Sequence, residues 1–171
     1  MPEFDVVSLG SADAPEAGDR APDFTRPLVN REYWEDRTLS ELAGESDGPT
    51  ILVFTPMIGS FLATYLWEEL AERGWDERAG QVVGVTAANP YGVKRFLEDG
   101  EYSFSLFADP GNGVAESYDL AHDLDGMAGV GEPRVALFAL ASDLTVEASW
   151  IADEWPEFPD YDGLEEAFDL S

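Results

Sequence analysis

The chain has 171 residues, of which 36 are acidic and 9 basic, so its formal net charge at neutral pH is −27. Because 44% of the residues are hydrophobic, the chain can bury a core, and bulk disorder is excluded despite the charge. The charge argues against a nucleic-acid partner and against an anionic membrane surface, since both are bound through Lys and Arg. With no cysteine in the chain, disulfides are excluded as well.

The beginning of the chain, Met1-Pro2-Glu3-Phe4-Asp5, has neither a basic region nor an apolar run that would indicate a secretion signal. The longest apolar runs are also far shorter than the ~20 residues that a spanning helix needs. We therefore expect a cytoplasmic protein. The excess of acids, with Lys94 as the single lysine, resembles proteins from salt-loving organisms and predicts that folding depends on salt; an ordinary acidic protein is the alternative.

We expect one domain over residues 1–171, with an arm or first strand over 1–17. The run Pro49–Thr55 is apolar and β-branched between Gly48 and Pro56, which is typical of a buried strand. Apolar residues at helical spacing follow it, and they predict a helix over Ser60–Arg78 with Ser60 as its N-cap.

The next segments alternate between strands and helices. Gln81–Thr86 is predicted to be a second buried strand and Phe104–Phe107 a short third one. Helices are predicted over Pro90–Glu98 and Gly113–Tyr118, the first opening on an Asn-Pro pair. This order is typical of parallel strands joined by crossover helices.

The last part of the chain predicts a hairpin, Arg134–Ala141 with Thr145–Ile151, and a final helix over Gly163–Leu170. The element order β, α, β, α, β, α, β, β, α indicates a thioredoxin-like three-layer α/β/α sandwich. Its central sheet is expected to be mixed, with parallel central strands and antiparallel late ones.

Five segments spread over residues 18 to 150 are similar to a known family. They are Gly18–Thr25, Thr38–Leu42, Phe54-Thr55-Pro56, Phe104–Gly111 and Pro133–Phe138. In this order they resemble the peroxiredoxins, the alkyl hydroperoxide reductase and thiol-specific antioxidant family. The resemblance implies an antioxidant oxidoreductase of the thioredoxin fold.

The resemblance also places the family's active site on this chain. The family motif is a Pro, three residues, Thr or Ser, two residues and the peroxidatic Cys, and here it falls on Pro56, Ser60 and Ala63. A methyl group thus stands where the family has its nucleophile. By the same resemblance, Arg134 holds the place of the second active-site arginine.

No other side chain is an evident replacement for the thiol. The hydroxyls of Ser60 and Thr64 need an activating base, and the single histidine, His122, is remote in sequence. Met57 could reduce one peroxide, but its sulfoxide would then need a repair enzyme. Thiol peroxidase chemistry is therefore impossible for this chain alone.

Arg134 and Pro56 each have two interpretations. Arg134 could hold a small anion or the carboxylate of a small-molecule ligand, or it could be paired by one of the many acids or simply exposed. Pro56 is a pocket wall by resemblance, or only the residue that terminates the strand.

The sequence patterns that would indicate a metal site or a cofactor site are incomplete, so we expect neither a bound metal nor a cofactor. The segment His122–Gly126 with Glu132, and likewise Asp160–Gly163, only approach the calcium-loop pattern. Gly111-Asn112-Gly113 lacks the third glycine of a dinucleotide-binding turn.

Residues 152–171 form an aromatic segment and a helix. The aromatic residues from Trp150 to Phe168 predict that this segment packs back on the domain, and a self-association surface for a homodimer is the rival interpretation. Three functions stay open: a non-catalytic binding or regulatory module, an antioxidant oxidoreductase using an unrecognised group or a partner's thiol, and an inert dimerisation scaffold.

Overall fold

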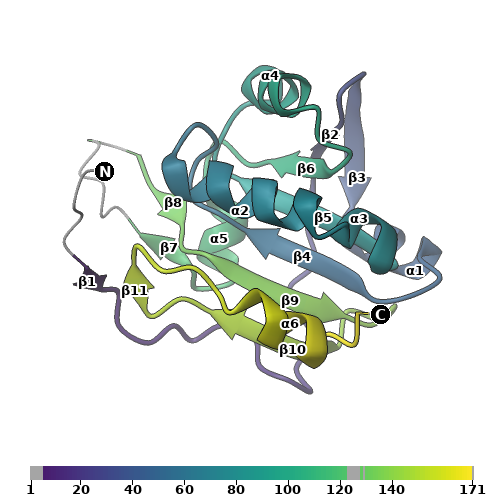
Figure 1. Cartoon of the computed structure of the whole chain (residues 1–171), viewed down its shortest axis with the longest axis vertical. Helices are drawn as coiled ribbons and strands as arrows, with labels where there is room; N and C mark the ends of the chain where they lie inside the picture. The colour runs from purple at the N-terminus through teal and green to yellow at the C-terminus, as the bar shows by residue number, and fades with distance from the viewer. Residues whose placement is uncertain (1–5, 123–127, 129, 171) are drawn as a thin grey trace.

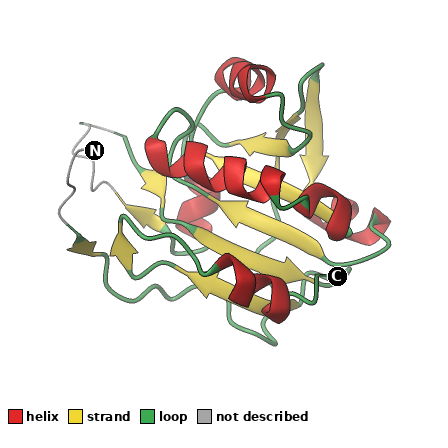
Figure 2. Cartoon of the chain, viewed as in Figure 1, coloured by secondary structure: helices red, strands yellow, loops and turns green. Residues whose placement is uncertain are grey.

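A mixed seven-stranded sheet forms the centre of the molecule (Figures 1 and 2). The computed structural model describes residues 6–122, 128 and 130–170. Across the sheet the strands follow the order β10 (Val146–Ile151), β9 (Ala136–Leu140), β4 (Thr50–Phe54), β5 (Gln81–Thr86), β6 (Ser105–Ala108), β2 (Thr25–Val29) and β3 (Trp34–Thr38). The pairs β4–β5 and β5–β6 are parallel and the remaining pairs antiparallel, so the predicted mixed sheet is confirmed.

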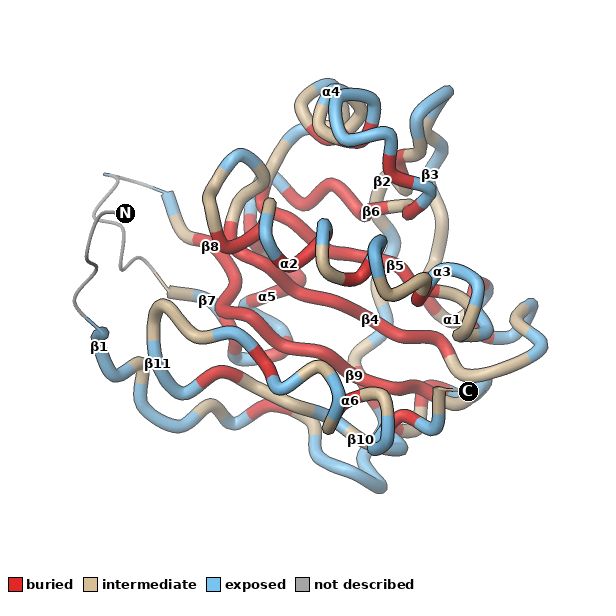
Figure 3. The backbone as a smooth tube through the Cα atoms, in the orientation of Figure 1, coloured by how far each residue is buried: buried red, intermediate tan, exposed pale blue. Residues whose placement is uncertain are grey.

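Helices cover both faces of this sheet, giving the three layers. The core on one face includes residues of α2 (Phe61–Glu72), α3 (Trp75–Arg78), α4 (Pro90–Gly100) and the segment of α6 (Tyr161–Ala167). The core on the other face includes residues of α1 (Leu39–Glu45) and α5 (Gly113–Ser117). All five residues of β4 are buried, as its continuous apolar run predicts for a central strand (Figure 3).

Several predicted boundaries are wrong. The helix expected over Ser60–Arg78 is two helices, because Gly74 has φ of 68° and breaks the helical path between them. The last helix begins two residues earlier than expected and ends at Ala167. Arg134 lies before β9 rather than inside it, since that strand begins at Ala136.

The two ends of the described chain pack on the domain. In the arm, β1 (Val7–Ser8) pairs with β11 (Glu154–Trp155). The main-chain N–H groups of Gly18 and Ala21 donate to the carbonyls of Val146, the first residue of β10, and of Leu144, in the turn before it. A second short pair is β7 (Ala121–His122) with β8 (Glu132–Pro133). Among the described residues, no helix has the length and apolar character that crossing a bilayer requires.

Candidate functional site

The carboxyl end of β4 leads directly into the predicted site. Pro56 is buried after the strand, and Ser60 caps α2, its Oγ accepting a hydrogen bond from the main-chain N–H of Ala63 at 3.3 Å. This confirms Ser60 as the N-cap. Ala63 is in the first turn of α2 and fully buried, so its methyl group is part of the packed interior.

The main chain of the loop between β4 and α2 already has partners. The N–H of Met57 donates to Glu132 Oε2 at 3.0 Å, and the N–H of Ile58 donates to Thr86 Oγ1 at 3.2 Å. Glu132 is 1% exposed and belongs to β8. These two loop donors are therefore not available to a ligand.

Arg134 is buried, and its partners are main-chain carbonyl groups. Nη1 donates to the carbonyls of Gly10 and Ala152 at 2.9 and 3.1 Å, and Nη2 donates to that of Leu9 at 3.3 Å. Within the described residues no carboxylate pairs with it, and its Nε is buried without a hydrogen-bond partner. The guanidinium thus holds the arm and the segment after β10 together. It is buried, and none of the described residues forms an ion pair with it.

Hydrogen bonds connect only some of the predicted site residues with one another. Ser60 and Ala63 share a hydrogen bond, and Glu132 ties the Met57 loop to the chain just before Arg134. In the described part of the chain, no hydrogen bond or ion pair connects Arg134 with Ser60.

Sequence reasoning missed the roles of Glu132 and Thr86. The sequence indicates Glu132 only as the end of an imperfect calcium-loop pattern, and because carboxylates are rarely buried its residue type gives no signal of the burial that the structure shows. The calcium-like residues 123–126 lie outside the described part. Within it, no group of three or more His, Asp or Glu side chains is placed to hold a metal ion.

A second buried carboxylate, Asp109, follows the carboxyl end of β6, at the same edge of the sheet as the Pro56 loop. Asp109 is 2% exposed; its Oδ1 accepts from Arg26 Nε at 3.0 Å and its Oδ2 from the N–H of Val114 at 2.8 Å. Burial raises the pKa of Tyr118 well above its usual range, and the hydroxyl of Tyr118 donates to the carbonyl of Pro22 at 2.6 Å. Both groups fix α5 against the first strands and have a structural role.

Most of this chain matches the model of a known protein family. The model of the AhpC/TSA family matches residues 17–149, from the end of the arm to β10. This chain belongs to the AhpC/TSA family. The expected family and fold are thereby confirmed.

Solved structures of peroxiredoxins share the fold. A peroxidoxin, BcpB, from Mycobacterium tuberculosis has a TM-score of 0.69 at 21% identity, covering 91% of this chain and 95% of its own. A thiol peroxidase from Chromobacterium violaceum has a TM-score of 0.72 at 20% identity, covering 95% and 90%. A reduced 2-Cys peroxiredoxin from Plasmodium vivax has a TM-score of 0.73 at 16% identity, covering 90% and 80%. A search of curated proteins finds no match to the sequence.

Proposed function

We propose that this member of the AhpC/TSA family is a non-catalytic binding or regulatory module. The observation that carries the proposal is Ala63, a buried methyl group in the first turn of α2. By its resemblance to the family motif, this residue holds the position of the family's nucleophile. A thiolate is the species that attacks peroxide, and the sequence contains no cysteine.

The substitutes considered for the thiol have no activating group in the described residues. Thr64 follows Ala63 in α2, and no hydrogen bond joins its hydroxyl to a base. A serine or threonine hydroxyl without a neighbouring base is a weak nucleophile at neutral pH. This supports a role in binding over a role in turnover.

The ligand we propose for this module is a small anion or carboxylate at Arg134. Nε of Arg134 is buried and has no hydrogen-bond partner among the residues that the structure describes. Buried donors of this kind normally bond to a polar group or a bound molecule. Nε and Nη2 form one edge of the guanidinium, and this edge matches the two oxygens of a carboxylate. Within the described part of the chain, this edge makes one hydrogen bond, from Nη2 to the carbonyl of Leu9.

The experiment is a titration of the isotope-labelled protein with acetate, followed through the Arg134 Nε–H signal by NMR at constant ionic strength. We expect this signal to shift in a saturable way, while the signal of exposed Arg31 moves only slightly. Arg134→Lys keeps the charge but removes the two-donor edge, so it should lose saturable binding. A wild-type Arg134 signal that does not respond to acetate would contradict the proposal.

A homodimer is a second proposal, supported by one exposed aromatic cluster. Tyr65 on α2 is 53% exposed and its ring lies 6.3 Å from that of Phe158, which is 40% exposed. Exposed aromatic groups of this kind are common at the centres of interfaces. Sedimentation in high salt should show a dimer that Tyr65→Ser weakens, and a strictly monomeric protein would overturn this proposal.

A further inference from the structure

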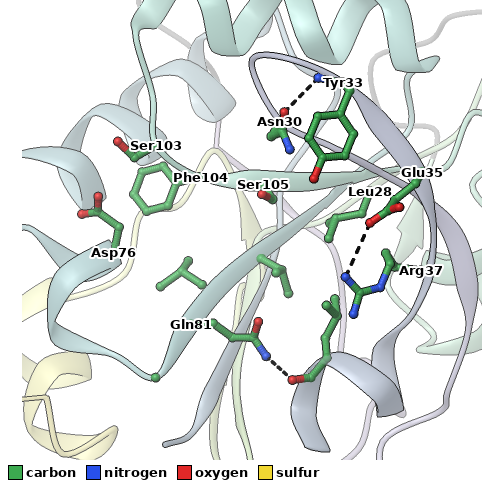
Figure 4. Close-up of a pocket in the computed structure, with 14 residues that line it drawn as sticks. Leu28, Asn30, Tyr33, Glu35, Arg37, Asp76, Gln81, Ser103, Phe104 and Ser105 are labelled. Atoms are coloured by element: carbon green, nitrogen blue, oxygen red, sulfur yellow. Dashed lines mark hydrogen bonds and ion pairs between the residues drawn. The ribbon is translucent and has the colours of Figure 1, made fainter. Parts of the chain in front are cut away.

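A cavity of about 370 Å³ lies at the amino ends of β5 and β6, at the edge of the sheet opposite the Pro56 loop (Figure 4). The strand lengths explain it. β5 begins at Gln81, but β6 begins only at Ser105, which pairs with Val83. Beside the first two residues of β5 the sheet therefore has no strand on this side, and the β2–β3 hairpin forms the far wall.

Three uncharged polar side chains of the cavity, Gln81, Ser103 and Ser105, have oxygens that can accept hydrogen bonds from a ligand. Nε2 of Gln81 donates to the carbonyl of Leu42 at 2.6 Å and to Thr50 Oγ1 at 2.9 Å, which fixes the amide and leaves its Oε1 as an acceptor. Among the described residues, the hydroxyls of Ser103 and Ser105 have no partner, and both line the cavity. A ligand rich in N–H donors would satisfy these oxygens.

The one cation in the lining is already neutralised. Its main partner is Glu45, which lies 2.8 Å from Arg37 Nη2. Glu35 is the weaker partner, because it lies 3.7 Å from Nη1 and its side chain is 56% exposed, so this carboxylate can still accept from a ligand. The lining also holds Asp76, an exposed carboxylate on α3 with no cation paired to it in the described residues. The charge of the cavity therefore favours a cation and opposes phosphates and carboxylates.

The two carboxylates are separated by apolar surface. Asp76 lies on one side of the cavity and Glu35 on the other, with Phe104 and Leu28 between them (Figure 4). A ligand that contacts both carboxylates needs a positive group at each end and an apolar middle. The side chains thus match a methylene chain that carries two ammonium groups.

We propose that this cavity binds an aliphatic diamine or polyamine, with one ammonium group at Asp76, another at Glu35, and the methylene chain over Phe104 and Leu28. The volume is within the range of small-molecule sites. Gln81 Oε1 and the two serine hydroxyls would accept the remaining N–H bonds. This site is separate from Arg134 and does not depend on the function proposed there.

The test is calorimetric titration with putrescine and spermidine, at a salt concentration where circular dichroism shows a folded chain. We expect saturable binding of both at one site, and much weaker binding of butylamine, which has one ammonium group. Asp76→Asn and Glu35→Gln should each weaken putrescine about tenfold, the loss of one charged hydrogen bond. Ser103→Trp, which fills the mouth without changing charge, should abolish binding.

The control variant is Glu116→Gln, an exposed acid on α5 that lies outside the cavity. It removes the same charge, so it should leave the putrescine affinity unchanged. If Glu116→Gln weakened putrescine as much as Asp76→Asn, the diamine would be held by the diffuse negative charge and the proposal would be overturned. Absence of saturable putrescine binding to the folded wild type would overturn it as well.

Discussion

At Ala63, two local effects would act on a thiol in opposite directions. The start of a helix favours a thiolate, and burial disfavours one. Here Ala63 is fully buried, its N–H already serves the Ser60 cap, and Arg134 is engaged with main-chain carbonyls. We expect burial to outweigh the effect of the helix terminus.

Ala63→Cys tests this balance. We expect the introduced thiol to react slowly with iodoacetamide at neutral pH, because its burial keeps the pKa at or above the ordinary value of about 8.5. The measurement is the alkylation rate against pH. The matched control is Ala71→Cys, which is exposed on the same helix and outside the proposed dimer cluster, so it should react as an ordinary thiol. If Ala63→Cys reacted faster than the control and with a pKa well below 8.5, the site would still stabilise a thiolate.

A substitution at Gly84 tests how tightly the central sheet is packed, because it adds a single Cβ atom to the core. A Cβ at Gly84 would lie 2.5 Å from the ring of Trp67, which is fully buried. Gly84→Ala should therefore lower the free energy of unfolding by about 1–3 kcal/mol, as measured by denaturant titration. Gly44→Ala is the control, because nothing lies within 4 Å of that Cβ and the site is helical. Equal stability of the two variants would contradict this account of the packing.

The partners of Arg134 could not be predicted from the sequence. The donors of a guanidinium can be matched to acids by charge, but here the acceptors are main-chain carbonyls, one of them 125 residues earlier in the chain. Because every residue carries a main-chain carbonyl, the residue types do not show which of these carbonyls a side chain will bond to. The position of Ala63 was predictable, because the spacing Pro56, Ser60, Ala63 fixes it relative to the strand end.

Among the elements, those buried on both faces were predicted best. The residue pattern of β4 and β5 is continuous and apolar, and the observed strands agree with the prediction to within one residue at each end. The β2–β3 hairpin has half-exposed strands that carry Pro27, Glu35 and Asp36, so its own pattern was too weak to predict it. The break at Gly74 was missed because the helical spacing continues across it.

The docking of α6 depends on Glu165. Its Oε2 accepts from Arg78 Nη1 at 2.8 Å and from Trp75 Nε1 at 3.0 Å, and lies 3.3 Å from Arg73 Nη1. Burial alone would raise the pKa of Glu165, but the hydrogen bonds from Arg78, Trp75 and Arg73 outweigh it, so the pKa is lowered. A carboxylate with a lowered pKa stabilises the fold above its unfolded pKa, and this contribution is lost as the pH falls through the folded value.

Glu165→Gln should therefore lower the melting temperature at neutral pH, with a loss of about 1–3 kcal/mol in the free energy of unfolding. Because the wild-type contribution disappears in acid, the difference between variant and wild type should shrink as the pH falls below about 4. Thermal melts across this pH range are the measurement. Glu166→Gln, at the exposed neighbour, should show no such difference, and a Glu165→Gln effect that is independent of pH would contradict the ion-pair account.

At the scale of the whole molecule, charge is the dominant feature. A net charge of −27 produces repulsion that opposes compaction, and salt screens it. We expect the melting temperature to rise strongly between dilute buffer and molar KCl, with part of the helical circular dichroism signal lost in dilute buffer. A melting temperature that is the same in both buffers would refute salt-dependent folding.

The overall fold was predictable because burial and turn residues mark the order of the buried strands and helices in the sequence. The five family-like segments indicate the same fold. The function could not be predicted in the same way, because the family's activity depends on a cysteine thiol and this chain has no cysteine. The competing interpretation is peroxide turnover by an unrecognised group or a partner's thiol, and it can be measured directly.

The most direct test is peroxide consumption by the purified, folded protein with a thiol reductant, at the salt concentration where it melts highest. The account predicts a rate equal to that of the reductant alone, both for the wild type and after addition of thioredoxin as a thiol partner. Reproducible turnover that scales with the concentration of the wild-type chain would contradict it.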